Sequence, residues 1–401
     1  IRVMLRYLLT RGLRALLTIT FVVTFAFVIL RLSGDPAMLI LSPEAPPEAI
    51  EAFRQSWGLD RPLWEQYLRY FRAIAEGNLG RSMRDGRWLI GYGMAGVTFH
   101  WYQQPCQARA TVHRDGTVVV SSAAADIGNG TYTVMTQVAA DALGLPLDRV
   151  RFELGDSDMP SSPQAGGSGL TVSLGPAVLG VCEELVQNLL QLACEDLSSP
   201  LHGFCRRDEI GVRDGCLYRV PDPAYGETFT DILARNDLPE LTVEMTSNPA
   251  QPMAQGLWPA VAFAAQFVEV RVDPDLGLVR VSRVVSAVDG GRILNEKLAR
   301  SQIVGSVVGG IGMALLEETM RDAGNGRIAN ATFGDYLIPV NADVPELDVI
   351  FVGEPDPINP IGVKGIGEVG LVGIAAAIAN AVYHATGTRV RDLPIVIERL
   401  L

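Results

Sequence analysis

One carboxylate lies in a glycine-rich loop near the carboxyl end of the chain, in the run Asn359-Pro-Ile-Gly-Val-Lys-Gly-Ile-Gly-Glu-Val-Gly370. Glycines on both sides of Glu368 let the backbone approach a ligand closely and adopt left-handed conformations. The apolar residues 371–386 have helical spacing, and the free N–H groups at a helix start stabilise an ionised carboxylate. Glu368 is therefore a candidate general base. The alternative is that it merely favours the first turn of a helix.

Two other glycine-rich segments could surround the same ligand. They are Asp126-Ile-Gly-Asn-Gly-Thr131 and Gln164-Ala-Gly-Gly-Ser-Gly-Leu-Thr-Val-Ser173. Bare backbone amides at a helix start attract anions, so each loop could hold a phosphate or a pterin. Taken singly, each loop is more often an ordinary turn. The three loops together, in this order, indicate a shared ligand site more strongly than any one of them does.

The cysteines and histidines do not have the spacing of a metal site. The five cysteines (106, 182, 194, 205 and 216) are never closer than 11 positions, and the four histidines (100, 113, 202 and 384) form no paired motif. No zinc site or iron–sulfur cluster is encoded, so a metal would have to arrive already held by an organic cofactor. Five scattered cysteines also do not indicate a disulfide scaffold.

The elements that would position the three loops are a mixture of strands and helices. Residues 108–112 and 117–121 alternate around Arg-Asp-Gly and predict a hairpin. Further strands are expected at 150–154, 267–272 and 278–287, and helices at 131–143, 174–197, 299–318 and 371–386. The stretch 198–250 is rich in turn residues and is expected to be irregular. The sequence predicts an α+β body.

Charge divides the chain into two parts. Residues 1–87 contain 12 Arg and no Lys against 8 acidic residues, whereas 88–401 carry a net charge of −16. An acidic body of this kind argues against nucleic-acid binding. A chain of 401 residues with 48% hydrophobic content is long enough for two or three domains.

The first part contains a candidate membrane span. Residues 15–30 carry no charge, and arginine snorkelling extends the apolar segment to 8–32. The arginines before it place its amino terminus in the cytoplasm. A cleaved signal peptide is the alternative, although no small-residue cleavage site follows. After Leu32 we expect no comparable charge-free segment of spanning length.

Four short segments of the first part form a recognisable set. They are Leu-Arg-Tyr-Leu-Leu at 5–9, Leu-Ser-Gly-Asp-Pro-Ala at 32–37, Leu-Asp-Arg-Pro-Leu-Trp-Glu-Gln-Tyr at 59–67 and Gly-Asn-Leu-Gly-Arg-Ser at 77–82. The set resembles the start of a dipeptide/oligopeptide-type ABC transporter permease, over residues 1–87. Such a permease needs several further spanning helices, so this segment is expected to anchor the chain in the inner membrane through one transmembrane helix and to transport nothing.

The body contains a second set of motifs. In order they are Asp-Ile-Gly-Asn-Gly-Thr-Tyr-Thr-Val-Met-Thr-Gln, Gly-Asp-Ser-Asp, Gly-Gly-Ser-Gly-Leu-Thr-Val-Ser, Asp-Gly-Gly-Arg-Ile-Leu-Asn and Lys-Gly-Ile-Gly-Glu-Val-Gly. This set resembles the molybdopterin-binding subunit of the xanthine dehydrogenase/aldehyde oxidase family, over residues 88–401. The resemblance implies mixed sheets and helices, a domain incomplete at its N-terminal side, and molybdenum held in molybdopterin cytosine dinucleotide.

The same resemblance assigns roles to individual residues. It implies that Glu368 deprotonates a molybdenum-bound hydroxide, which attacks an electrophilic carbon while hydride passes to a sulfido ligand, so that water supplies the oxygen of the product. For two of the implied cofactor contacts an ordinary structural role is the alternative: Gln302 could hydrogen-bond within its own helix, and Asn129 could cap a turn. The sequence departs from the family pattern at Asn129, Val304 and Ser306. The implied cofactor contacts are Gly128, Asn129, Gly130, Gly166, Gly167, Ser168, Ser173, Gln302 and Gly367.

The resemblance also implies an oxidoreductase assembly. A 2Fe–2S subunit and an FAD subunit would take electrons from molybdenum, and the substrate would be an aldehyde or an N-heteroaromatic. The front half of the family's subunit is absent, so the chain is expected to be inactive alone. The two parts are expected to join at Asp85-Gly86-Arg87, a short run of residues that fits the pattern of both the permease and the molybdopterin-binding subunit. The alternative is a non-enzymatic, membrane-anchored chimera displaying its body in the periplasm, whereas the body by itself is expected in the cytoplasm.

Overall fold

The structure is a computed structural model. It describes residues 58–75, 83–250 and 260–401, together with Arg14, Leu17, Thr18, Thr20, Thr24, Phe27, Val28, Glu51, Arg54 and Gln55. The chain divides into two units, Ile1–Arg81 and Ser82–Leu401. The predicted junction at residues 85–87 therefore lies inside the second unit, where these residues form the end of strand β1 and the turn into β2.

The first unit contains helix α4, Leu63–Ala75. This helix begins directly after Pro62, and an ion pair of 2.6 Å between Arg61 and Glu65 spans its first turn. Most of the predicted span 8–32 lies outside the described residues, but those that are described between Arg14 and Val28 are helical. The hydroxyls of Thr24 and Tyr67 are 2.7 Å apart, which joins this helical segment to α4.

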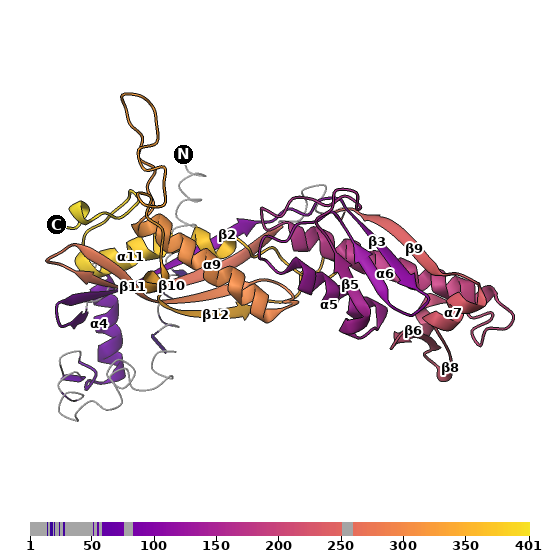
Figure 1. Cartoon of the computed structure of the whole chain (residues 1–401). Coiled ribbons are helices and arrows are strands. Elements are labelled where there is room, and N and C mark those ends of the chain that lie inside the picture. The colour runs from indigo at the N-terminus through magenta and orange to yellow at the C-terminus, as the bar shows by residue number, and fades with distance from the viewer. Residues whose placement is uncertain are drawn as a thin grey trace, which may run out of the picture. The chain divides into compact units, whose positions relative to one another are not determined.

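The second unit contains a five-stranded sheet in the order β1-β2-β10-β11-β12. Its neighbours are antiparallel except for β11 and β12, which are parallel. The sheet packs against α9 and α11 on one face (Figure 1), and the short helix α10 also contacts its strands. The bounds are Met83–Asp85 (β1), Trp88–His100 (β2), Val261–Asp273 (β10), Leu278–Asp289 (β11), Glu346–Val352 (β12), Glu296–Leu315 (α9), Val369–Val372 (α10) and Ile374–Thr386 (α11).

Glycines allow the helices to lie close to this sheet and to one another. A Cβ at Gly93 of β2 would come within 2.1 Å of the carbonyl oxygen of Ala377 in α11. A Cβ at Gly310 of α9 would lie 2.6 Å from Cβ of Ile374. On the other face of the sheet, the large apolar side chains Tyr92, Met94, Phe263, Phe267 and Ile350 are exposed.

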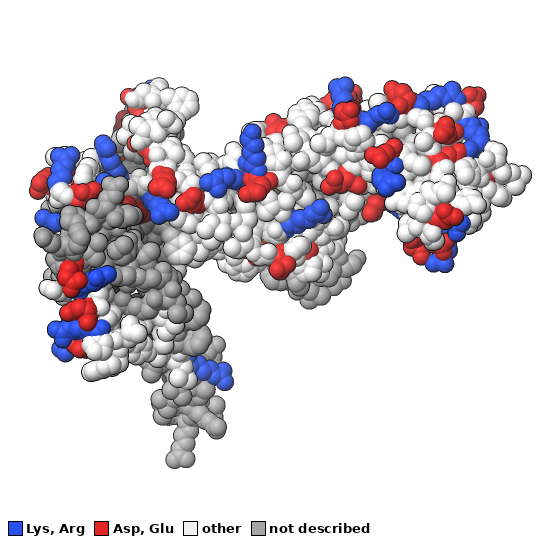
Figure 2. Space-filling view, turned by 90° about the horizontal axis from the view of Figure 1, so that it is seen from below, with Lys and Arg blue, Asp and Glu red and all other residues white. Residues whose placement is uncertain are grey.

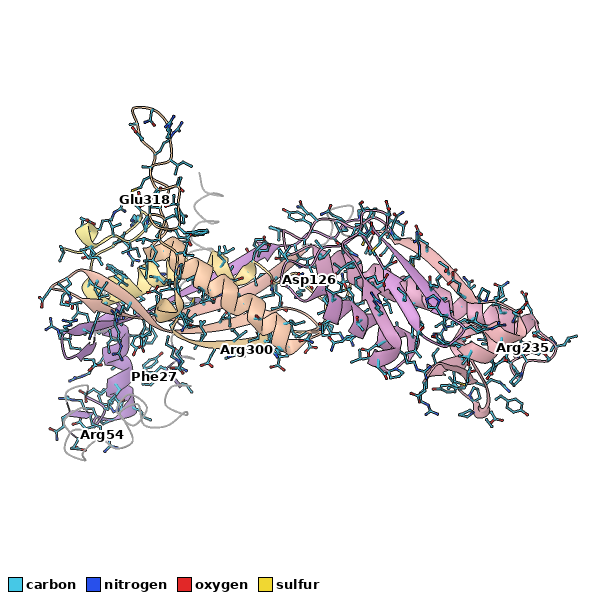
Figure 3. All side chains as sticks on the ribbon, viewed as in Figure 1. Phe27, Arg54, Asp126, Arg235, Arg300 and Glu318 are labelled. Carbon is cyan, nitrogen blue, oxygen red and sulfur yellow. A yellow bond between two sulfur atoms is a disulfide. The ribbon has the colours of Figure 1, made fainter. Side chains whose placement is uncertain are left out.

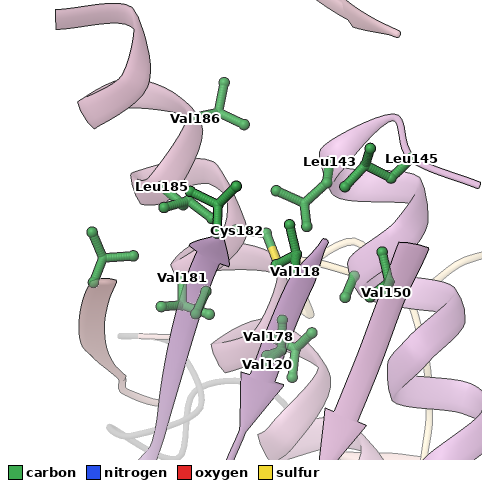
Figure 4. Packing of buried hydrophobic residues seen from close by; sticks show 14 of the residues in the cluster. Val118, Val120, Leu143, Leu145, Val150, Val178, Val181, Cys182, Leu185 and Val186 are labelled. Carbon is green, nitrogen blue, oxygen red and sulfur yellow. The ribbon is translucent and has the colours of Figure 1, made fainter. Parts of the chain in front are cut away.

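A second core lies under the four-stranded sheet β5-β4-β3-β9. Helices α5 and α6 pack on this sheet, and Val120 of β4 lies beside Val178 of α6 (Figure 4). The bounds are Cys106–His113 (β3), Val118–Ser121 (β4), Val150–Glu153 (β5), Glu240–Ser247 (β9), Thr131–Leu143 (α5) and Leu170–Glu195 (α6). The predicted hairpin is confirmed, since β3 and β4 pair as antiparallel strands.

The expectation that 198–250 is irregular is wrong. Besides β9, this stretch forms a three-stranded antiparallel sheet and a short helix, α7. A disulfide between Cys194 of α6 and Cys205 links this stretch to the preceding helix, which the scattered cysteines did not indicate. The bounds are Ile210–Arg213 (β6), Cys216–Arg219 (β7), Asp222–Thr228 (β8) and Phe229–Arg235 (α7), with short 3₁₀ helices at Leu147–Arg149, Arg207–Glu209, Asn341–Asp343 and Ile397–Arg399 elsewhere.

Three segments of the second unit are long and apolar enough to cross a membrane by length and composition, which contradicts the expectation for residues after Leu32. They are Leu170–Glu195, Glu296–Leu315 and Val369–Thr386. Burial explains their composition, because Leu185 and Leu189 of α6 and Ile378 of α11 lie fully inside the two cores. Apolar content alone did not separate core helices from membrane spans.

The charged side chains of the second unit are mixed in sign. On the face seen in Figure 2, acidic and basic side chains of the described residues alternate and do not gather into one basic field. Arg283 of β11, for example, lies between the carboxylates of Asp348 and Glu346 of β12, at 3.2 and 3.9 Å.

Candidate active site

The loop that carries Glu368 runs from the end of β12 to α10. Glu368 is the residue that immediately precedes the first turn of α10, as the glycine pattern predicts. Its side chain makes no capping hydrogen bond to that helix. The carboxylate is half-buried and is directed to a residue far away in the sequence. The helix start therefore positions the Glu368 backbone without occupying its carboxylate.

The partner of that carboxylate is Ser168, in the glycine-rich loop before α6. The Ser168 hydroxyl donates a hydrogen bond of 2.6 Å to Oε2 of Glu368. The same hydroxyl oxygen accepts the backbone N–H of Glu368 at 3.1 Å. Ser168 has a φ of 52°, a left-handed conformation that is uncommon outside glycine and costs energy. The fold thus holds this serine against Glu368 with both of its hydrogen-bonding functions in use.

Further contacts hold the Glu368 loop on its other sides. The Ser306 hydroxyl of α9 donates to the carbonyl of Gly367 at 2.6 Å. A Cβ at Gly365 would lie 2.2 Å from the carbonyl oxygen of Ser168 and 2.5 Å from Cβ of Trp101. Only glycine allows this approach of the two loops. Ser306, one of the departures from the family pattern, therefore contributes a contact to the loop.

An ion pair ties the same loop to the end of β11. Lys364 Nζ lies 2.6 Å from Asp289 Oδ2, with both side chains mostly buried. Backbone bonds add to this contact, because the N–H of Arg292 donates to Gly362 at 2.7 Å and the N–H of Lys364 donates to Gly290 at 3.0 Å. Asp289 and Arg292 belong to the motif Asp-Gly-Gly-Arg-Ile-Leu-Asn, whose pattern predicted no role for either residue. Lys297 and Lys364 are the two lysines of the sequence, and this rarity was the available signal for Lys364.

The three loops border a cavity of about 330 Å³. Five glycines, at which the wall is bare backbone, lie on it: Gly166, Gly167, Gly169, Gly290 and Gly365. The charged groups on the wall are Glu368, Lys364 and Arg292. Seven residues singled out from the sequence line this cavity together: Asn129, Gly166, Gly167, Ser168, Gln302, Gly367 and Glu368.

Gly128 and Gly130 do not line the cavity, and their amides are already occupied. The carboxylate of Asp126 accepts the N–H of Gly128 at 2.9 Å, of Gly130 at 3.2 Å and of Tyr132 at 3.3 Å. Figure 3 shows Asp126 at the start of α5. Burial alone would raise the pKa of Asp126, but these backbone hydrogen bonds outweigh it and hold the pKa below its usual value.

The left-handed glycines of this loop therefore serve its shape. Gly130 has a φ of 81°, and a Cβ there would lie 2.5 Å from a methyl carbon of Leu298 in α9. Asn129 accepts the N–H of Ile127 at 3.2 Å and donates to the Thr131 hydroxyl at 3.0 Å, which is the turn-capping alternative. The Asp126 loop thus fits against the second core and presents Asn129 at the cavity wall.

Ser173 lies inside helix α6 and outside the cavity. Its side chain is 1% exposed. Its hydroxyl donates to the carbonyl of Gly169 at 2.7 Å and accepts the N–H of Gln104 at 3.0 Å. In this structure Ser173 joins the start of α6 to the segment that follows β2. Its cofactor contact is left as a prediction.

The donors on the cavity wall suit an organic group with anionic substituents. Gly166 offers open space, because the nearest atom to a Cβ built there is 3.9 Å away, and Gly167 is left-handed. Backbone amides, the amide of Gln302 and the cations of Arg292 and Lys364 are the types of group that bind a pterin or a phosphate. Among the described residues, no three His, Cys, Asp or Glu side chains converge to hold a metal ion.

Comparison with known families agrees with this fold. Residues 72–345 match the family model described as "Molybdopterin cofactor-binding domain", and the chain belongs to this family. Residues 4–92 match a second model, "Binding-prot-dependent transport system membrane comp, N-term". The two matches overlap at residues 72–92, around the predicted junction. Glu368 lies beyond the first match, so its role remains a prediction.

Individual relatives are molybdenum-binding subunits. The chain is 37% identical to the aldehyde oxidoreductase molybdenum-binding subunit PaoC of Escherichia coli K12, over 80% of this chain and 41% of that protein. It is 31% identical to the putative xanthine dehydrogenase molybdenum-binding subunit XdhA of the same strain, over 81% and 42%. The fold matches quinoline 2-oxidoreductase from Pseudomonas putida 86 with a TM-score of 0.69 and 23% identity, covering 88% of this chain and 44% of that one.

The chain therefore spans about two fifths of the length of these curated relatives. The α+β expectation is confirmed at the level of a mixed α/β fold shared with molybdenum hydroxylase structures. The relatives are subunits of oxidoreductases, and the molybdopterin-binding family is the one that the sequence motifs resemble.

Proposed function

We propose that the second unit is the catalytic part of a molybdenum hydroxylase large subunit, which oxidatively hydroxylates an aldehyde or an N-heteroaromatic with water as the oxygen source. The observation that carries this proposal is the position of Glu368. Among the residues that the structure describes, it is the one carboxylate on the wall of a cavity lined by all three glycine-rich loops. A half-buried carboxylate facing a small-molecule cavity is suited to proton transfer.

The cofactor would be molybdopterin cytosine dinucleotide with molybdenum, which supplies the metal centre that accepts the substrate's electrons. In our proposal the wall residues Gly166, Gly167, Gln302 and Gly367 hold its polar groups. The proposed cofactor contacts of Gly128, Gly130 and Ser173 would not use the amide N–H groups of the two glycines or the donor proton of Ser173, because these already have partners in the fold. Glu368 would accept a proton at its carboxylate, and the half-buried position would limit competition from bulk water.

Replacing Glu368 by Gln tests the proposal. The change keeps the shape of the side chain and removes the base, so turnover should fall by about 10²- to 10⁴-fold. Because this chain spans two fifths of its relatives' length, turnover is measured with an aromatic aldehyde and a dye acceptor in an intact relative with the same loop. Molybdenum content should persist. The matched control is Glu354→Gln, an exposed position in the same loop region.

Unchanged turnover in Glu368→Gln with full molybdenum content would remove Glu368 from the mechanism. A parallel loss in Glu354→Gln would indicate damage to the loop and would remove the support for Glu368 as the base. Loss in the first variant alone, with molybdenum retained, is the expected result.

We further propose that the whole subunit acts with a 2Fe–2S subunit and an FAD subunit, and that this chain is inactive without the remainder of the subunit. The partial length against the relatives supports this, and so does the apolar sheet face bearing Met94, Phe263 and Phe267. An exposed apolar patch of this kind indicates a missing partner surface. Addition of the missing part to the purified chain should restore turnover, and activity of the chain alone would contradict this part of the proposal.

A second candidate follows from the match of residues 4–92 to a transport membrane component. We propose domains at 1–87 and 88–401, with residues 8–32 as an inner-membrane anchor and Asp85-Gly86-Arg87 as the junction of a chimera. In the non-enzymatic form of this candidate the anchor displays an inert body. Long-read sequencing across codons 80–95 tests the junction, and fractionation with a molybdenum assay tests the body. A membrane-bound, metal-free body would favour this candidate over the enzyme.

A further inference from the structure

We propose that Ser168 is a positioning residue that fixes Oε2 of Glu368 and leaves Oε1 as the proton acceptor. This inference rests on the proposed role of Glu368 as the base. The Ser168 hydroxyl donates to Oε2 at 2.6 Å. Among the described residues, no hydrogen bond reaches Oε1. The two oxygens of one carboxylate are therefore in different environments.

The geometry restrains Glu368 at two points. The backbone N–H of Glu368 donates to the Ser168 oxygen at 3.1 Å while the hydroxyl proton is directed to the carboxylate. One serine thus bridges the main chain and the side chain of the same glutamate. A side chain restrained at one oxygen loses most of its rotamer freedom before the substrate arrives, which is how an oriented base gains its rate advantage.

The position of Ser168 is itself over-determined. Gly167 and Ser168 both have left-handed backbones, with φ of 60° and 52°. The Ser168 carbonyl faces Gly365, where a Cβ would come within 2.2 Å. A non-glycine residue keeps a left-handed conformation only when its surroundings compensate the strain. The cost of this conformation is balanced here by contacts with the very loop that carries Glu368.

Ser168 also lies on the cavity wall beside Glu368 and Gln302. A Cβ at Gly367 would lie 3.3 Å from the Ser168 hydroxyl and 3.8 Å from Oε1 of Gln302. The serine hydroxyl is therefore close enough to the cavity for a cofactor contact, as the resemblance implies. In our interpretation its two hydrogen bonds to Glu368 use the hydroxyl, and its main role is to orient the base.

The first test uses the full chain without cofactor. In Ser168→Ala the Glu368 amide loses its acceptor, so its hydrogen exchange should become about tenfold faster. Ser306→Ala is the matched control, because Ser306 contacts the carbonyl of Gly367 and neither hydrogen-bonding group of Glu368. Its Glu368 amide should keep its protection. Equal protection of that amide in wild type and Ser168→Ala would overturn the proposal.

The second test uses the molybdenum-loaded assembly. Ser168→Ala should lower kcat about ten- to hundredfold with KM and molybdenum content unchanged, since a misplaced base slows chemistry without weakening binding. Ser168→Gly also removes the hydroxyl but relieves the left-handed strain, so the same loss in both variants assigns the effect to the hydroxyl. A raised KM or a lower molybdenum content, with kcat unchanged, would overturn the positioning role.

Glu368→Gln in the same preparation separates this proposal from the proposed function. If Glu368→Gln stays active, the base itself is wrong and the function fails. If Glu368→Gln is inactive and Ser168→Ala turns over normally, the function stands and the positioning role of Ser168 is refuted.

Discussion

Replacing Gly365 by Ala should separate the loop that carries Glu368 from the loop that carries Ser168. The added Cβ would lie 2.2 Å from the Ser168 carbonyl oxygen, 2.5 Å from Cβ of Trp101 and 2.9 Å from Cβ of Ser168. These atoms are backbone or the first atom of a side chain, and Trp101 is 1% exposed, so none can rotate away. The loops themselves must move apart.

The cost follows from the overlap. Forcing one methyl group into a packed site costs about 1 to 3 kcal/mol, and contact with rigid backbone places Gly365→Ala at the upper end of that range. For a unit of this size, about 3 kcal/mol lowers the melting temperature by roughly 5 °C or more. Thermal unfolding of the cofactor-free chain, followed by circular dichroism, measures it.

The matched control is Gly166→Ala in the opposite loop. The nearest atom to a Cβ at Gly166 is 3.9 Å away, so this change should leave the melting temperature unaltered. Its methyl group would enter the cavity, and molybdenum content should fall in a cofactor-loaded preparation. The melting temperature should therefore fall in Gly365→Ala and stay unchanged in Gly166→Ala, whereas Gly166→Ala should lower the molybdenum content.

Hydrogen exchange connects the stability change to the site. If the loops separate in Gly365→Ala, the Glu368 amide should lose protection together with the stability loss, because its acceptor belongs to Ser168. A variant that melts within about 1 °C of wild type and keeps that protection would refute the steric argument.

Two further predictions concern other parts of the second unit. Asp126→Asn should destabilise the second unit by about 1 to 2 kcal/mol in chemical denaturation at neutral pH, because a neutral amide accepts the loop N–H groups less strongly. The folded-state pKa of Asp126 is lowered, so the stabilisation is present above the unfolded-state pKa and is lost as pH falls through the folded-state pKa. A stability difference between wild type and variant that stays the same in acid would contradict this prediction. Non-reducing mass spectrometry after denaturing alkylation should find Cys106, Cys182 and Cys216 labelled and Cys194 joined to Cys205. In the native state Cys216 should react first, because Cys106 and Cys182 are buried and burial raises the pKa of Cys182 to about 12. Labelling of all five cysteines without reduction would exclude the disulfide.

Elements with local signals were predictable from the sequence. Helix α5 was expected at its observed bounds, and the β3–β4 hairpin follows from alternation around Arg-Asp-Gly. Strand β2 was missed because its inward positions include Gly91 and Gly93, which interrupt the apolar pattern. Glycine is required at both positions because α11 lies against them. A Cβ at Gly91 would lie 2.0 Å from the carbonyl oxygen of Ala381, and a Cβ at Gly93 would lie 2.1 Å from that of Ala377. The tertiary contact removed the local signal.

The site was predictable in its parts and not in its contacts. The glycines around Glu368 indicated a ligand loop, and seven of the predicted residues line one cavity. No pattern shows that the Asp126 carboxylate would occupy the amides of Gly128 and Gly130, because an aspartate in a turn can point to solvent equally well. The Ser168–Glu368 bond joins residues 200 positions apart, a separation over which spacing carries no information.

The Ser168–Glu368 bond also joins the two cores of the second unit. Ser168 lies two residues before α6, whose Leu174 and Leu185 pack in the core of the four-stranded sheet, whereas Val369 follows Glu368 and packs in the core of the five-stranded sheet. A shift of one core against the other would therefore move Ser168 and Glu368 in opposite senses. The orientation of the proposed base then depends on how the two cores dock, and its geometry is a property of the whole unit. For the same reason, perturbations at Gly365 are expected to reach the carboxylate without touching it.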